Sequence, residues 1–201
     1  MKSKIALSVF LSLVIVLTGC SAAWVSTIDS ILAAAAPALI DILQIVSVAE
    51  GKPYNTALAT KINQDAADLK KLAADFSANS NSHGCQLLQA SISTYQGDIQ
   101  TVLQVAQVSD PNTQNKVILL TGLVAGTVQA IVAVIPSCQA PASIMRAMAV
   151  QPPAGTRQFV ISYNRYLTAK TGNPQVDKLT PTLKIHQHSA FVRVVSLGLA
   201  K

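Results

Sequence analysis

The sequence is poor in the side chains and motifs from which most catalytic sites are built. Aromatic residues make up 4% and charged residues 12% of the 201 residues. There is no Walker loop, Gly-x-Gly-x-x-Gly turn, His-Glu-x-x-His helix, Cys-x-x-Cys pair or Gly-x-Ser-x-Gly elbow. These absences argue against P-loop, dinucleotide-binding, zinc-protease, thioredoxin-like and α/β-hydrolase functions. We therefore expect no enzymatic activity and no cofactor, with a helical hydrolase of unrecognised site as the alternative.

Histidine and paired carboxylates are also scarce. His186 and His188 would lie on one side of an extended segment, but a zinc site takes more ligands and His83 is the only other histidine. We expect an exposed loop there and no bound metal. Asp29 and Asp41 are twelve residues apart and could share one face of a helix. An N-terminal charge and a polar edge explain them better than a catalytic pair.

One long apolar run stands out against this background. Residues 117–136 (VILLTGLVAGTVQAIVAVIP) have Thr121, Thr127 and Gln129 as their only polar side chains. A helix of this length is about 30 Å long. A helix that is apolar on all sides must be buried in protein or in lipid. We expect the rest of the chain to be organised around this helix.

Two glycines on this run, Gly122 and Gly126, form a small-xxx-small pair. This spacing lets two helix backbones approach closely in a membrane. It serves equally in a soluble core, beside the alanines at 33–36, which permit the close approach of a neighbouring helix. The sequence leaves both interpretations open.

The first 20 residues form a targeting segment. Lys2 and Lys4 precede an apolar stretch at 5–17, which is too short for an ordinary transmembrane span. The stretch ends in LTGC at 17–20. This motif resembles the lipobox of bacterial lipoproteins, in which a small-residue cleavage site precedes an invariant cysteine. The alternatives are a plain secretory signal with a chance cysteine, or an uncleaved anchor helix.

The resemblance implies a lipid anchor. Residues 1–19 would be removed as a signal peptide, Cys20 would carry a diacylglyceryl group, and its new amino terminus would receive a fatty acid such as palmitate. More than one acyl chain is enough for stable membrane anchoring. In Gram-negative lipoproteins a residue such as Ser21 after the cysteine implies export to the outer membrane. The expected location is therefore the cell envelope, on the periplasmic face of the outer membrane in a Gram-negative cell.

Charge is distributed unevenly along the mature chain. Residues 20–138 have five Lys/Arg and eight Asp/Glu, a balance of −3, whereas residues 139–201 have eight and one, a balance of +7. In an exported lipoprotein this basic region favours anionic lipid or another envelope surface as a partner, and not nucleic acid. A solvated basic tail is the alternative. The candidate residues for anionic-surface binding are Arg157, Arg165, Lys170, Lys178, Lys184 and Arg193.

Helical periodicity of apolar residues divides the first part of the chain into four segments. The predicted helices cover residues 27–50, 55–78, 85–108 and 111 to about 136. Ser26 and Asp29 resemble a capping box, Gly51 a helix end, and Asp110 an N-cap, while Pro37 should kink the first helix. Short connections favour antiparallel neighbours, so the sequence predicts an all-α, antiparallel four-helix bundle in residues 20–138.

The chain after residue 138 has a different character. Breakers at 140–141 and 151–155 separate predicted helices at 143–150 and 156–169. TGNP at 171–174 ends the second of these, Pro181 interrupts residues 175–183, and residues 191–199 fit a short helix or a strand. We expect residues 139–201 to be an irregular, partly helical basic region packed on or trailing from the bundle.

An aromatic stripe marks one face of the predicted helix at 156–169. Phe159, Tyr163 and Tyr166 recur at helical spacing, with Arg157 and Arg165 on another face. The stripe could stack on a ligand. We interpret it instead as the surface that docks onto the bundle.

The two remaining cysteines are predicted to form a disulfide. With Cys20 used by the lipid, Cys85 and Cys138 are an even pair in an oxidising compartment. They lie about 25 residues before and 28 residues after the turn near residue 110, so an antiparallel hairpin returns both to the same end. A disulfide needs Cα atoms within about 7 Å, which neighbouring helix ends can reach.

These observations lead to two functional hypotheses. In the first, the chain is a lipid-anchored envelope protein that acts as a non-catalytic structural or binding module. In the second, helix 117–136, with residues 31–49 as a further candidate, enters the bilayer. The basic residues that follow would then lie on the cytoplasmic side, as the positive-inside bias prefers.

Overall fold

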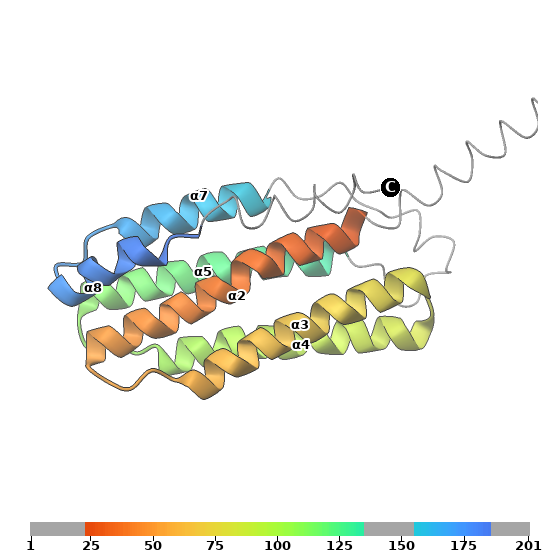
Figure 1. Cartoon of the computed structure of the whole chain (residues 1–201), viewed down its shortest axis with the longest axis horizontal. Helices are drawn as coiled ribbons and strands as arrows, with labels where there is room; N and C mark the ends of the chain where they lie inside the picture. The colour runs from red at the N-terminus through yellow and green to blue at the C-terminus, as the bar shows by residue number, and fades with distance from the viewer. Residues whose placement is uncertain (1–22, 135–154, 186–201) are drawn as a thin grey trace, which may run out of the picture.

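The computed structural model describes residues 23–134 and 155–185, and every regular element in these ranges is a helix (Figure 1). The elements are α2 (Ala23–Glu50), α3 (Thr56–Ala78), α4 (Ser82–Val105), α5 (Pro111–Val134), α7 (Gly155–Thr168), α8 (Pro174–Leu179) and the 3₁₀ helix η1 (Thr180–Leu183). The expected all-α class is confirmed. The lipobox, Cys138, Arg193, His186, His188 and the segments expected at 143–150 and 191–199 lie outside the described residues.

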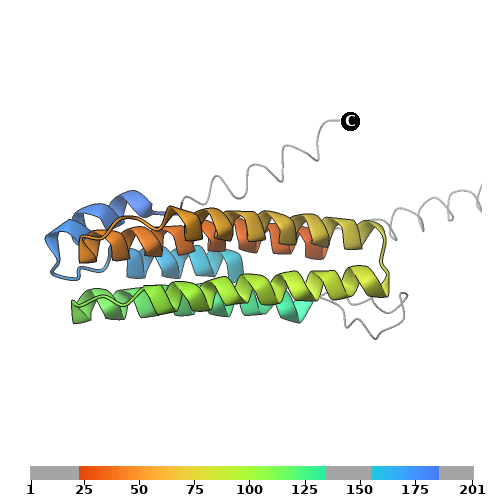
Figure 2. The ribbon, with the colours of Figure 1, turned by 90° about the horizontal axis from the view of Figure 1, so that it is seen from below.

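The four long helices run alternately in opposite directions and form a closed ring of neighbours. In Figures 1 and 2, α2, α3, α4 and α5 lie along one common axis. α2 packs on α3, α3 on α4, α4 on α5, and α5 on α2. This is the antiparallel four-helix bundle that the short connections predicted.

The centre of the fold is α2, and not the most apolar run of the sequence. α2 contacts α3, α4, α5, α7 and α8. Its fully buried side chains occur on more than one side, including those of Ile28, Leu39, Ile42 and Ile45. Ala34, Ala35 and Ala38 are buried as well, and their small side chains allow neighbouring backbones to come close to α2.

The sequence left burial in protein or in lipid open for the helix at 117–136, and the described residues enclose only one side of it. On α5, Val117, Leu120, Val124, Val128 and Ile131 face the core. On the outward side of α5, Ile118 and Leu119 are each 49% exposed and Val132 is 45% exposed. The reason is topological: α5 is a corner of the bundle, so only part of its circumference meets other helices.

The ends of the helices follow the capping signals with one exception. Gly51 has a φ of +61° after α2, and the Lys52 amide donates to the Ser47 carbonyl (3.0 Å), as in a glycine-terminated helix. The Asp110 carboxylate accepts from the Thr113 amide (2.8 Å) at the start of α5. The capping box at Ser26 is wrong, because α2 is already helical there.

Pro37 lies inside α2, and the helix continues through it. The proline is exposed, so its ring points away from the core. At the next residue, the Tyr163 hydroxyl of α7 donates to the Ala38 carbonyl (3.0 Å). A proline within a helix removes one backbone hydrogen bond, and α7 supplies an additional bond to the backbone beside it.

α7 is fastened to the bundle at two further points. Phe159 and Leu167 are buried against it, which confirms the docking interpretation for part of the aromatic stripe. Tyr166 is 40% exposed and lies outside that contact. At the C-terminal end of α7, the buried ammonium of Lys116 on α5 donates to the Leu167 carbonyl (2.9 Å). A lysine at this position also interacts favourably with the helix dipole.

A short polar turn joins α7 to α8. Gly172 has a φ of +85°, a conformation that glycine adopts without strain. The Asp177 carboxylate accepts from the amides of Thr171 (2.8 Å) and Gly172 (3.1 Å). The Asn173 side chain caps α8, whose Val176 is buried. The predicted break at 171–174 therefore folds the chain back onto α2.

Prediction for the core of α2. Ala35 is fully buried in the most enclosed helix, so Ala35→Leu has no space for its extra atoms. We expect it to lower the free energy of unfolding by about 1–3 kcal/mol, as overpacking of a core does. Urea denaturation measures this.

The matched control is Ala67→Leu on α3, where the alanine is exposed. It should change the free energy of unfolding by no more than about 0.5 kcal/mol. Equal losses for both variants would contradict the central position of α2.

Candidate functional site

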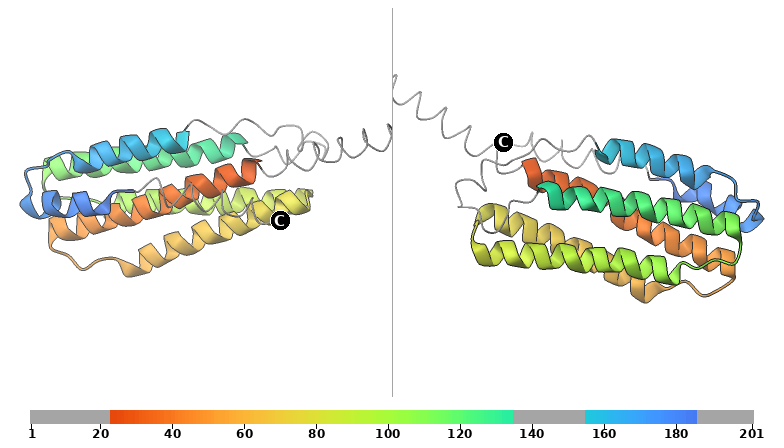
Figure 3. Two further views of the ribbon diagram at one scale, coloured as in Figure 1. Left: turned by 45° about the horizontal axis from the view of Figure 1, so that its top comes forward. Right: turned by 180° about the vertical axis from the view of Figure 1, so that it is seen from behind.

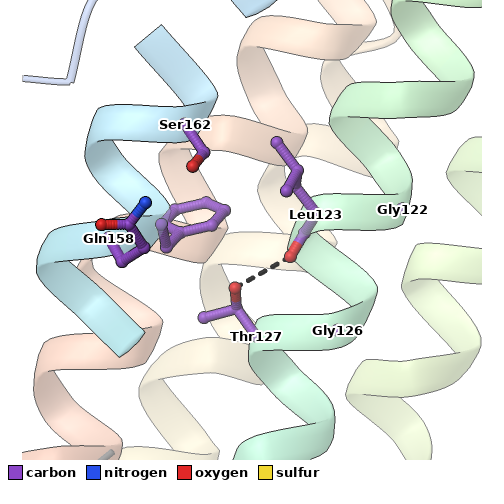
Figure 4. A pocket seen from close by; sticks show the side chains of 7 residues that line it. Gly122, Leu123, Gly126, Thr127, Gln158 and Ser162 are labelled. Carbon is purple, nitrogen blue, oxygen red and sulfur yellow. Dashed lines mark hydrogen bonds between the residues drawn. The ribbon is translucent and has the colours of Figure 1, made fainter. Parts of the chain in front are cut away.

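A shallow groove of about 260 Å³ lies between α5 and α7. Figure 4 shows the side chains that line it. They come from one stretch of each helix: Gly122, Leu123, Gly126 and Thr127 on α5, and Gln158, Phe159 and Ser162 on α7. No charged side chain is among the described residues that line the groove. Its chemistry suits an apolar side chain or the ridge of another helix.

The groove is open on the α5 side because Gly122 and Gly126, which have no side chains, lie on the exposed side of that helix. A Cβ atom on Gly122 or Gly126 would meet no atom of the described residues within 4 Å. The Thr127 hydroxyl donates to the Leu123 carbonyl of its own helix (2.8 Å, dashed in Figure 4). The methyl group of Thr127 therefore points toward the groove. Of the two interpretations of the glycine pair, the structure does not support packing beside the alanines of α2, since both glycines are exposed.

A second candidate site is a charged cluster between α3 and α4. The Lys61 ammonium donates to Asp65 (2.6 Å) and to Asp98 (2.5 Å). Burial raises the pKa of Asp98, which is only 2% exposed. Burial is the largest single effect on Asp65 and raises its pKa, but the hydrogen bonds with Lys61 and Asp98 and the positive charge of Lys61 together hold the pKa of Asp65 below its usual range. Asp98 is thus the carboxyl group of this pair that retains a proton more readily.

The cluster is better suited to joining helices than to acid–base catalysis. The Tyr95 hydroxyl and Asp98 Oδ2 are buried and have no hydrogen-bond partner among the described residues. Burial raises the pKa of Tyr95 well above its ordinary value, and the nearby carboxylates act in the same direction. A substrate cannot reach Asp98, because almost none of its surface is accessible. Lys61 and Asp98 instead link α3 to α4.

A third polar position, Asp41, lies where α2 meets α7. Burial raises the pKa of its carboxyl group to about 7, against the opposing effect of the Tyr163 hydroxyl. Burial likewise raises the pKa of Tyr163, and the Asp41 carboxylate adds to it. Burial also raises the pKa of Tyr54, and the negative charge of Asp41 raises it further. Asp41 is therefore half-protonated near neutral pH.

Asp29 and Asp41 do not act as a pair in this fold. Asp29 forms an ion pair with Lys70 of α3 (2.7 Å), whereas Asp41 lies beside Tyr163 of α7. The two carboxyl groups serve different neighbours. Among the described residues, no group of three or more histidine, cysteine, aspartate or glutamate side chains is arranged to hold a metal ion.

The predicted basic residues that the structure describes are distributed over α7, α8 and the segments that flank α8. The five that the structure describes, Arg157, Arg165, Lys170, Lys178 and Lys184, are all exposed. None of them forms an ion pair with another described residue. α7 has the two arginines along its length, while Lys170 and Lys178 lie near α8, at the end of the bundle where α2 finishes (Figure 1).

The predicted disulfide has one partner among the described residues. Cys85 lies in the first turn of α4, is fully buried and is not a free side chain. α5 ends at Val134, four residues before Cys138, at the same end of the bundle (Figure 2). Cys138 itself lies outside the described residues, so the pairing stays a prediction.

Prediction for Asp41. Its folded-state pKa of about 7 lies above the value of about 3.9 expected for an unfolded chain. The fold therefore loses stability as the pH rises through this interval. Asp41→Asn cannot ionise, so above pH 7 it should be more stable than the wild type by about 1–3 kcal/mol. This is less than the full equivalent of the shift, because the side chain is partly exposed.

Urea denaturation at pH 4 and pH 8 measures the difference. The two proteins should have similar stability at pH 4 and diverge at pH 8. Asp68→Asn, at an exposed aspartate of α3, is the control and should follow the wild type. A stability difference for Asp41→Asn that is the same at both pH values would refute the assignment.

Prediction for the disulfide. Peptide mapping of the native protein without reductant should yield a linked Cys85–Cys138 peptide. Closing a loop of 53 residues (138 minus 85) would stabilise the fold by up to about 4 kcal/mol in the chain-entropy model. Reduction should lower the free energy of unfolding accordingly. Two free thiols in undamaged envelope material would overturn the pairing.

No family model matches the chain, and the comparisons with curated proteins and with solved structures find no match. The function is therefore argued from the residues and geometry of this chain.

Proposed function

We propose that this chain is a lipid-anchored protein of the cell envelope that acts as a non-catalytic structural or binding module. The observation that carries the proposal is the LTGC motif at 17–20, followed almost at once by a long helix. α2 begins at Ala23, three residues after Cys20. Three extended residues span at most about 10 Å. A lipid on Cys20 would therefore hold the start of α2 close to the membrane surface.

This short tether gives the bundle two distinct ends. The end next to the membrane contains the start of α2, the loop between α3 and α4, and the end of α5 (Figure 1). The loop has the sequence Asn79-Ser80-Asn81, which is polar and uncharged. α2 has 28 residues and is about 42 Å long. In an upright bundle, the opposite end lies about that far from the anchoring membrane.

The basic residues of the opposite end then have a different partner from the anchoring membrane. Lys170 and Lys178 lie near α8 at that end. The attraction of an anionic bilayer falls off within a Debye length of about 8–10 Å. At roughly 40 Å these lysines do not sense the membrane that holds Cys20. Another anionic envelope surface, facing the outer end of the bundle, fits their position better.

The alternative is a membrane-inserted protein. α2 (Trp24–Glu50) and α5 (Pro111–Val132) are both long and apolar enough to cross a membrane by length and composition. Most of the window of α2 is buried inside the bundle, which is also expected for a core helix, whereas most of the window of α5 is not. Insertion of α5 would place the buried ammonium of Lys116 at one end of the span. We favour the anchored bundle because it keeps α5 in contact with α2.

Prediction for the anchor. Cys20→Ala removes the thiol that would accept the lipid, so the chain should accumulate as a precursor that retains residues 1–19. Wild-type protein from membranes should begin at residue 20 and have the mass of acyl chains on Cys20. Intact-mass spectrometry and gel mobility measure both.

Ser21→Ala is the matched control, since it changes the neighbouring residue and leaves the thiol in place; it should be processed and acylated like the wild type. Wild-type protein that is cleaved elsewhere, or has no added mass on Cys20, would disprove the lipid anchor.

A further inference from the structure

The long sides of α4 and α5 present almost no charge to solvent. The structure describes every position from Ser82 to Val132. Within this range the Asp and Lys residues are Asp98, Asp110 and Lys116. Asp98 and Lys116 are buried, and Asp110 caps the start of α5. His83 is exposed, but it lies at the extreme end of α4.

The outer side of α3 is the opposite case. It exposes Lys61, Asp68, Lys71 and Asp75, which are spread over more than three turns. A surface with charges of both signs is ordinary for a helix that faces water. The uncharged side of the bundle is therefore a property of α4 and α5, and not of the chain as a whole.

The uncharged side is apolar at its centre. Figure 3 (right) shows α5 between α4 and α7 on this side of the molecule. Along α5, Ile118, Leu119 and Val132 are each nearly half exposed. Between them, Gly122 and Gly126 leave open space above the helix backbone. Another helix could approach α5 closely at these glycines.

The flank on α4 consists of side chains that both donate and accept hydrogen bonds. Gln89, Ser93 and Gln100 are exposed there. The amide of Gln96 donates to the side-chain oxygen of Gln129 on α5 (3.2 Å), so the same chemistry continues onto α5. Hydroxyl and amide groups have a donor and an acceptor each. They can pair with their own copies across a two-fold axis, which charges of one sign cannot do.

We propose that this uncharged face of α4 and α5 is the interface of a homodimer, in which α5 packs against α5 of a second copy at Gly122 and Gly126. A two-fold interface uses the same patch on both subunits and must be self-complementary. A face that combines an apolar centre, open glycines and donor–acceptor flanks, without charge, meets that requirement. Depletion of charged residues is also the compositional mark of an interface core.

The size of the face fits a stable dimer. Two helices of 24 residues are each about 36 Å long. With a helix diameter of roughly 10 Å, the face covers about 700 Å². A standard interface buries about 800 Å² on each partner.

A second copy fits this face better than acyl chains do. In a bilayer core, Gln89, Ser93 and Gln100 would lose their hydrogen bonds to water without replacement, which is costly. The proposed lipid anchor also favours a second copy, because it holds all copies on one surface with α2 starting at the membrane. The parallel orientation of the two α5 helices rests on that proposed function, whereas the interface itself does not.

A photo-crosslinking side chain at Leu119, in the full chain produced in its membrane, tests the proposal. Leu119 is half exposed on α5, so the fold tolerates the change. The expected product has twice the mass of the chain, and its crosslinked peptides join α5 to α5. The same side chain at Gln64, which is exposed on α3, should give no such product. Crosslinks from Leu119 to lipid, to another protein, or within the same chain to residues 135–154 would each overturn the dimer.

A second variant separates packing from folding. Gly122→Leu with Gly126→Leu fills the space through which the partner helix would approach. The described part of the monomer has room for these side chains, because none of its atoms lies within 4 Å of either Cβ position. We expect unchanged helical content and at least a tenfold lower yield of the Leu119 dimer. Ala67→Leu on the charged face is the control and should leave the yield unchanged. An undiminished dimer in the glycine variant would overturn the close approach of α5.

Acyl mass on Cys20 is measured in the same samples. Cys20→Ala should reduce the dimer yield only by lowering the local concentration of the chain, and the dimer should reappear when more protein is produced. Failure of lipidation with an intact dimer would reject the anchor and retain the interface. Full lipidation without the dimer would retain the anchor and reject the interface.

Discussion

The fold depends on the burial of α2 against five other elements. A helix surrounded in this way cannot have a polar face, and its alanines set how close its neighbours can come. Ala34, Ala35 and Ala38 have no exposed surface, so they meet other helices where larger side chains would hold the backbones apart. α3, α5 and α7 all pack against this one element, and α3 also packs on α4 and α7 on α5. Removing apolar surface from water along α2 is thus the dominant stabilising contribution.

α7 shows how the C-terminal part of the described chain becomes part of the same core. It packs on α2 and α5, and Tyr163 and Lys116 add hydrogen bonds at its middle and its end. Both bonds are buried, and burial of a polar group is tolerated only when it has a partner. Burial lowers the pKa of Lys116, but the Leu167 carbonyl and nearby Asp177 offset that cost. The basic charge of this region therefore lies on exposed residues of a docked helix.

The sequence was sufficient to predict the helices and their antiparallel order, because both follow from local patterns. Apolar spacing located α2 to α5 to within a turn, and Asp110 and Gly51 marked two of the ends. The sequence pattern could not predict which side chains of α5 are buried, because hydropathy counts apolar residues without showing which of them contact a neighbouring helix. Ile118 and Leu119 have the same composition as a core, yet they lie at a corner of the bundle.

The sequence pattern also could not show which polar residues interact with each other. Asp98 interrupts the buried stripe of Tyr95, Ile99 and Val102, and a charged residue at that spacing was the available signal for an internal ion pair. Its partner, Lys61, lies 37 residues away and could be identified only from the packing of α3 on α4. Asp41 gave no comparable signal, since its pKa is raised by burial within the fold, which the local sequence pattern does not show. Contacts between distant segments determine such groups.

The uneven surface of the bundle links its structure to its proposed place in the envelope. Ion pairs on α3 keep one side hydrated, while α4 and α5 present hydroxyl, amide and apolar groups without charge. A monomer gains nothing in stability from open space at Gly122 and Gly126, because glycine is unfavourable inside a helix. The cost of two such glycines is offset if they let another helix approach. A tether at Cys20 would leave that side free along its whole length, since it would hold only the start of α2.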